Sequence, residues 1–124
     1  MGNEMSPVLD MSVVEELIAL SDDGDPELLL DLIQMFLDDG PTKVASILEG
    51  VQQQDFDKVE RAAHSLKGSA GNLGATLLQD TCERLQIIAR THELQEAQEV
   101  SSNLESRFTA AKSALQELQD AYSS

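Results

Sequence analysis

Apolar residues in the middle of the chain recur at alternating spacings of three and four, and this repeat constrains the fold more than any other feature. Spacings of this kind align side chains along one face of an α-helix. Asp55 is suited to cap the start of that helix, and Gly74 to end it after about Asn72. The resulting buried stripe consists of Phe56, Val59, Ala63, Leu66, Ala70 and Leu73.

Helical spacing continues through the rest of the chain, and no segment shows the apolar–polar alternation of a half-buried strand. Asp25 followed by Pro26 is a strong signal for a helix start, and Gly40-Pro41 is typical of a helix end. We therefore predict helices separated by turns and by a weakly marked break near residues 91–93. They cover residues 10–20, 26–39, 42–53, 55–72, 75–90 and the remainder as far as Tyr122.

The composition fits a single domain built from such helices. The chain has 124 residues, of which 41% are hydrophobic but only 3% aromatic, so its core must consist mainly of Leu, Ile, Val and Ala. We predict an all-α protein, an antiparallel four-helix bundle with one or two short accessory helices. Residues 1–9 are expected to form a flexible leader and residues 10–122 a single domain.

The charge balance excludes several classes of function. Eight basic and 23 acidic residues give a formal net charge of −15, which repels phosphate backbones and anionic lipid surfaces. We therefore expect neither nucleic acid nor a membrane as a partner, and solubility is the simplest role of the charge. The N-terminus lacks a signal-like segment, and the single cysteine, Cys82, fits a reducing compartment such as the cytoplasm.

One polar group within the 55–72 helix has the chemistry of a functional site. His64, Lys67, Gly68 and Gly71 are grouped by spacings of three and four on a face that differs from the buried stripe. His64 is therefore predicted to be exposed, with a lysine one turn away. An unperturbed imidazole has a pKa of about 6.5, so a solvated ring is largely neutral near pH 7 and can attack phosphorus without a separate base.

The two glycines of this group need an explanation, because each lowers the stability of a helix by about 1 kcal/mol relative to alanine. Either a neighbouring helix packs closely against them, or the missing side chain leaves space beside the imidazole. A phosphoryl group on His64 would use that space, and Lys67 would neutralise its oxygens. The simpler alternative is that a histidine beside a lysine is only a solvated helix face.

The stretch from Ala63 to Gly74 resembles the signature of histidine-containing phosphotransfer (HPt) domains, A-H-x-L-K-G-x-A-x-x-x-G. This extended motif is much more specific than H-x-x-K-G alone. The resemblance covers roughly residues 10–120 and implies a four-helix bundle with an exposed histidine, in agreement with the fold predicted above. The matching positions are Ala63, His64, Leu66, Lys67, Gly68, Ala70 and Gly74.

By this resemblance, His64 is the phosphoacceptor, Lys67 assists the phosphoryl group and Gly68 provides clearance. The implied reaction is an in-line attack on the phosphoaspartate of a response-regulator receiver domain, whose own site holds a divalent metal and does most of the catalysis. The group then passes to another receiver aspartate. The chain would need no ATP, metal or other cofactor of its own, so it would be a phosphocarrier rather than a self-sufficient enzyme.

The helix predicted at residues 75–90 supplies further site candidates. Members of the family often have a polar residue on the neighbouring helix that hydrogen-bonds the site, and Gln86 is the best match here. Gln79, Glu83, Gln86 and Arg90 share one face of this helix. Arg90 would add positive potential, although a surface position at a helix end explains it equally well.

The partners implied by the resemblance are response-regulator receiver domains and a hybrid sensor histidine kinase, and a monomer is expected. Docking needs an apolar patch beside the histidine. Leu17, Leu20 and Met35 are candidates for this patch, although ordinary core positions are the simpler interpretation.

Other functions stay open. The chain can instead be the phosphoacceptor domain of a larger chemotaxis-type or hybrid sensor kinase, although no glycine-rich nucleotide box follows residue 75. A non-catalytic helical adaptor with an HPt-like fold and an idle histidine is the alternative from a different class. A metal-binding bundle is disfavoured because facing helices carry no Glu-x-x-His pair, and residues 22–25 lack the spacing of a calcium loop.

Overall fold

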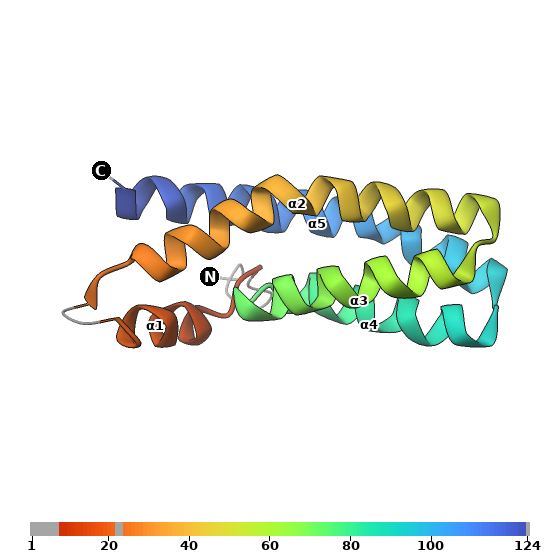
Figure 1. The fold of residues 1–124 in the computed structure, drawn as a ribbon, viewed down its shortest axis with the longest axis horizontal. Helices are drawn as coiled ribbons and strands as arrows, with labels where there is room; N and C mark the ends of the chain where they lie inside the picture. Colours follow the sequence, from red (N-terminus) through yellow and green to blue (C-terminus); the bar gives the residue numbers. More distant parts are fainter. Residues whose placement is uncertain (1–7, 22–23, 124) are drawn as a thin grey trace, which may run out of the picture.

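The computed structural model describes residues 8–21 and 24–123, and every regular element of this part is helical. The helices are α1 (Met11–Ala19), α2 (Glu27–Gln53), α3 (Phe56–Asn72), α4 (Thr76–Thr91) and α5 (Leu94–Ser123). α2 and α5 form one layer, α3 and α4 form the other, and the short α1 extends the second layer beyond the end of α3 (Figure 1). The predicted all-α bundle with a short accessory helix is thus confirmed. None of the described helices is long and apolar enough to cross a membrane.

The two helices predicted on either side of Gly40-Pro41 are a single helix, so the predicted helix end is wrong. α2 continues through Pro41 and changes direction near its middle (Figure 1). Gly40 is buried against α5, where an added Cβ would lie 2.6 Å from Cε1 of Phe108. A proline inside a helix forfeits one backbone hydrogen bond, and we attribute the continuity of α2 to this close packing against α5.

Side-chain caps and one glycine turn mark the helix boundaries. Asp10 Oδ1 accepts a hydrogen bond from the Ser12 N–H at 3.0 Å, and Asp55 Oδ1 accepts one from the Lys58 N–H at 3.1 Å. Gly74 follows α3 with φ +76°, and its carbonyl accepts the Asp10 N–H at 2.7 Å. This bond ties the start of α1 to the end of α3 at a turn that favours glycine.

The stripe predicted for α3 lies at the centre of the core. Phe56, at the start of the stripe, is only partly covered, whereas the other members are buried. Of the predicted leader, residues 1–7 lie outside the described residues, and Leu9 is buried in the core. The packed part of the chain therefore begins before Asp10. The buried members of the stripe are Val59, Ala63, Leu66, Ala70 and Leu73.

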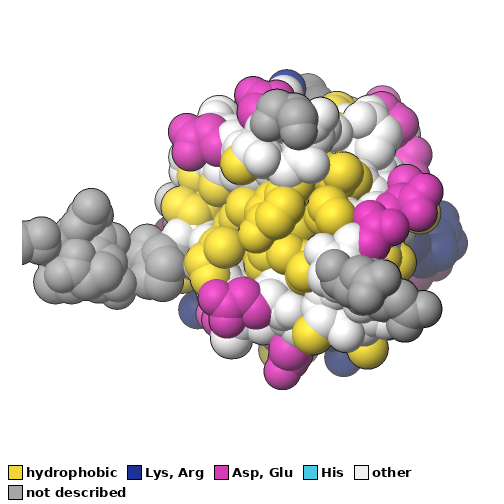
Figure 2. All heavy atoms as spheres, turned by 90° about the vertical axis from the view of Figure 1, so that its left-hand side faces the viewer, with side chains coloured by type: hydrophobic (Ala, Val, Ile, Leu, Met, Phe, Trp, Pro, Cys, Tyr) yellow, Lys and Arg dark blue, Asp and Glu magenta, His cyan; other side chains and the backbone are white. Residues whose placement is uncertain are grey.

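Hydrophobic side chains also gather at one end of the bundle, where acidic side chains surround them (Figure 2). Leu20, at the end of α1, is 74% exposed, and Leu28, near the start of α2, is also exposed. Apolar surface is therefore available outside the core. A shallow hollow of about 330 Å³ between α1 and α5 is lined by Val8, Leu9, Met11, Ala114, Glu117, Leu118 and Ala121.

Candidate functional site

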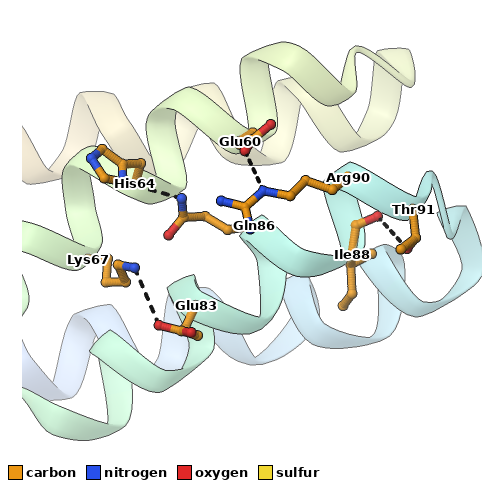
Figure 3. Close-up of polar contacts among 8 residues, drawn as sticks. All are labelled: Glu60, His64, Lys67, Glu83, Gln86, Ile88, Arg90 and Thr91. Carbon is orange, nitrogen blue, oxygen red and sulfur yellow. Dashed lines mark hydrogen bonds and ion pairs between the residues drawn. The ribbon is translucent and has the colours of Figure 1, made fainter.

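His64 lies in the middle of α3 with an exposed side chain, as its spacing predicted. Gln86 reaches it from α4, and the Gln86 Nε2 and His64 Nδ1 atoms are 3.3 Å apart (Figure 3). The Gln86 side chain belongs to the buried layer between the helices, because the residue is only 4% exposed. One edge of the imidazole is therefore held against the bundle, and its second ring nitrogen lies on the side away from Gln86 (Figure 3).

The orientation of the Gln86 amide decides which ring nitrogen carries the proton. Gln86 Oε1 is buried and has no hydrogen-bond partner among the described residues. A half-turn of the amide exchanges its oxygen and nitrogen, and Oε1 then accepts a hydrogen bond from Nδ1–H of His64. In that arrangement His64 Nε2 carries the free lone pair, as a nucleophile requires.

Lys67 and Arg90, the two cations expected to support His64, are each paired with a glutamate. Lys67 Nζ lies 3.3 Å from Glu83 Oε1, and Arg90 Nε donates to Glu60 Oε2 at 2.7 Å (Figure 3). The guanidinium that was expected to add positive potential therefore has a carboxylate as its partner. These glutamates were not predicted as part of the site, because they lie 16 and 30 residues from their partners. The only sequence signal for these two glutamates is that Glu83 shares a helix face with Gln86.

The two glycines of the motif have different explanations. A Cβ added at Gly68 would meet nothing within 4 Å, so no neighbouring helix requires a glycine there. A Cβ at Gly71 would lie 2.5 Å from Nε2 of Gln79, which packs across from α4. Of the two reasons open from the sequence, close packing therefore applies to Gly71, and open space applies to Gly68.

Two of the three residues considered for docking lie outside the core. Leu20 is 74% and Met35 is 58% exposed, so a core position is wrong for both, whereas Leu17 is partly buried against the core. Met35 lies beside the exposed face of α3. It lines a small hollow of about 90 Å³ between α2 and α3, together with Leu32, Phe36, Asp39, Lys43, Ser69, Asn72 and Leu73.

The surroundings of the other histidine, His92, and of the single cysteine, Cys82, indicate structural roles. Cys82 is fully buried, and its burial raises the pKa of the thiol to about 12, against a smaller lowering by Lys67. His92 ends α4 with φ 59°, and its ring stacks on Phe56 with centroids 4.7 Å apart. Within residues 8–21 and 24–123, no cluster of His, Cys, Asp or Glu side chains could hold a metal ion.

Comparisons with known proteins agree with this geometry. The sequence profile of the Hpt domain matches residues 31–121. The fold is similar to that of histidine-containing phosphotransfer protein B (HptB) from Pseudomonas aeruginosa PAO1, with a TM-score of 0.83 and 29% identity. That match covers 94% of this chain and 98% of the other.

Curated relatives come from fungi, plants and bacteria. The phosphorelay intermediate protein YPD1 of Saccharomyces cerevisiae is 30% identical over 71% of this chain and 53% of its own length. The chemotaxis protein CheA of Salmonella typhimurium is 34% identical over 77% of this chain but only 13% of its own. Multistep phosphorelay regulator 1 of Schizosaccharomyces pombe is 29% identical over 64% of this chain and 27% of its own. The chain thus spans about half or less of these relatives, and on the strength of the profile match it belongs to the Hpt domain family.

Proposed function

We propose that the chain is a histidine phosphotransfer protein that relays a phosphoryl group through His64 between aspartates of response-regulator receiver domains. The observation that carries this proposal is an exposed imidazole whose Nδ1 contacts a buried glutamine, beside a glycine that leaves open space. An idle histidine on a solvated face would need neither feature. The family of the chain, in which several relatives are named as phosphorelay or phosphotransfer proteins, supports the same function.

The reaction follows from the position of the ring nitrogens. The Nε2 lone pair of His64 attacks the phosphorus of a receiver phosphoaspartate, and the N–P bond forms as the P–O bond to the aspartate breaks. The electron pair of the broken bond returns to the aspartate carboxylate. The proton stays on Nδ1, which donates a hydrogen bond to Gln86 Oε1 once the amide has made the half-turn described above, and the reverse sequence delivers the group to the next receiver.

The other site residues support the phosphoryl group in different ways. Lys67 supplies a mobile positive charge one turn after His64, once its ammonium leaves Glu83. Gly68 leaves room for the group and for the receiver that brings it. Arg90 adds positive potential only to the extent that Glu60 releases it.

The proposed partners are receiver domains and, upstream, a hybrid sensor histidine kinase. The divalent metal belongs to the receiver, and the chain needs no cofactor of its own. Leu20 and Met35 offer exposed apolar surface for docking, and Leu17 contributes its accessible part. We propose that the chain acts as a monomer in this exchange.

A second candidate role is the phosphoacceptor domain of a larger kinase. The match to CheA, which covers 77% of this chain but 13% of that protein, favours this alternative. The two roles share His64 and differ in the donor. An acceptor domain takes its phosphoryl group from an ATP-binding kinase domain, whereas a relay protein exchanges it with receivers in both directions.

The first test is phosphorylation by a small histidine phosphodonor such as phosphoramidate, followed by intact mass and phosphorus NMR. We expect one acid-labile phosphoryl group on the wild type and on His92→Gln, and none on His64→Gln. His92→Gln is the matched control because it removes the other histidine of the chain. Phosphorylated receiver domains then serve as donors, and reversible exchange with them supports the relay role over the kinase-domain role. If neither donor modifies His64, the relay function is wrong.

A further inference from the structure

The two basic side chains assigned to support the phosphoryl group are each paired with a glutamate before that group arrives. Lys67 is paired with Glu83, and Arg90 with Glu60, at distances of 3.3 and 2.7 Å. Figure 3 shows the two pairs on either side of the His64–Gln86 contact. Neither Lys67 nor Arg90 is therefore freely available to an incoming anion, because each already has an anionic partner.

A phosphoryl group on His64 changes this balance. It brings up to two negative charges and three acceptor oxygens to a position one turn from Lys67. Glu83 and the phosphoryl group then compete for the same ammonium. Lys67 and Glu83 have side chains that are 28% and 57% exposed, so their pairing is weak enough to exchange.

We propose that Glu83 is a positioning residue whose ion pair with Lys67 competes with the phosphoryl group for the ammonium. This competition destabilises phosphohistidine relative to the phosphoaspartate of a receiver. This inference rests on the proposed function of His64. A fully available Lys67 would stabilise the charged product and retain the group on the histidine. Glu83 offsets that stabilisation, so the equilibrium for transfer to a receiver aspartate lies further toward the aspartate. The bonds made and broken are those of the transfer described above and do not involve Glu83.

The second ion pair provides a matched control. Glu60 pairs with Arg90, at a shorter distance and on the opposite side of the Gln86 contact from Lys67. Glu60→Gln removes the same charge as Glu83→Gln but frees a different cation. An effect confined to Glu83→Gln therefore reports on Lys67 rather than on the general loss of negative charge.

The experiment measures the equilibrium constant for exchange between phosphorylated His64 and one receiver domain. We expect Glu83→Gln to shift this constant toward phosphohistidine by about two- to fivefold, a range set by the strength of exposed ion pairs. Glu60→Gln should shift it less than twofold. In a Lys67→Gln background, Glu83→Gln should have no further effect, because the ammonium that it frees is gone.

The outcomes separate this inference from the function on which it rests. Loss of phosphorylation in His64→Gln, together with an unchanged equilibrium in Glu83→Gln, overturns the role of Glu83 and leaves the relay function standing. A shift of equal size in Glu60→Gln, or one that persists without Lys67, also overturns it. A purely structural role of Glu83 would change unfolding without changing the partition between histidine and aspartate, so urea unfolding of each variant completes the comparison.

Discussion

At the residue scale, Gly68 is a glycine inside a helix that no neighbouring side chain requires, as the proposed access role predicts. Glycine inside a helix costs about 0.5–1 kcal/mol relative to alanine, and the space beside Gly68 holds no atom that a Cβ would meet within 4 Å. We expect Gly68→Ala to raise the free energy of unfolding by about that amount and to slow phosphotransfer from a receiver. Urea unfolding and rapid-quench transfer assays measure the two effects.

Gly71→Ala is the control for this substitution. Its new Cβ would lie 2.5 Å from Nε2 of Gln79, so the gain in helix propensity is offset by displacement of that side chain. Gly71→Ala should therefore stabilise less than Gly68→Ala. Destabilisation by Gly68→Ala would contradict the interpretation of this glycine as an access feature.

The burial of Cys82 makes the free energy of unfolding depend on pH and fixes the sign of that dependence. Desolvation raises the pKa of the thiol from 9.0 to about 12, with Lys67 opposing the shift. Below pH 9 the thiol is protonated in both the folded and the unfolded chain, whereas between pH 9 and 12 only the unfolded chain ionises. Between pH 8 and pH 10 the wild type should therefore lose about 1 kcal/mol more stability than Cys82→Ala. Urea unfolding at several pH values tests this, and equal losses in the two proteins would refute it.

The sequence predicted the part of the site that lies within one helix turn. His64, Lys67 and Gly68 are related by fixed helical spacing, so their shared face needs no tertiary information. Resemblance suggested that Gln86 lies beside His64, and the two side chains are in contact in the structure, while the role of Gln86 stays a prediction. The pairing of Glu83 with Lys67 could not be predicted, because it depends on the register between α3 and α4, which helical periodicity leaves undetermined.

At the element scale, α2 shows why a local stop signal can fail. Gly40-Pro41 favours a helix end by propensity, yet the helix continues because Gly40 lets the Phe108 ring of α5 approach closely. Phe108 also stacks on Phe36 of α2, with ring centroids 5.2 Å apart. Tertiary packing therefore overrides the local preference, and only the fold reveals the role of the glycine.

Gly40→Ala tests this packing. The new Cβ would lie 2.6 Å from Cε1 of Phe108, and displacing a buried ring is expected to lower the free energy of unfolding by about 1–3 kcal/mol despite the better helix propensity. In a Phe108→Leu background the penalty should largely disappear, as a double-mutant cycle in urea unfolding will show. An equal penalty in both backgrounds would mean that a different contact fixes the course of α2.

At the scale of the whole molecule, the uneven distribution of charge over the helices matters more for the approach of a charged partner than the total charge does. The formal net charge is −15, yet α3 carries more basic than acidic side chains, unlike every other described helix. Its basic residues are Lys58, Arg61 and Lys67. Within the described residues, no carboxylate forms an ion pair with Arg61, which is exposed one turn before His64. We expect α3 to repel the proposed receiver, which brings an anionic phosphoryl group, less than the other helices do.

Arg61→Glu should slow association with a phosphorylated receiver, because a charge at the rim of a docking face acts mainly on the association rate. We expect a decrease on the order of threefold at low ionic strength, and a smaller one near 0.5 M salt, where the screening length is short. Lys112→Glu, an equal change of charge at an exposed position of α5, is the control and should have little effect. Stopped-flow binding measures both rates. Equal slowing by the two substitutions would show that the receiver responds to the total charge of the molecule, whereas slowing by Arg61→Glu alone would identify the exposed face of α3 as the surface it approaches.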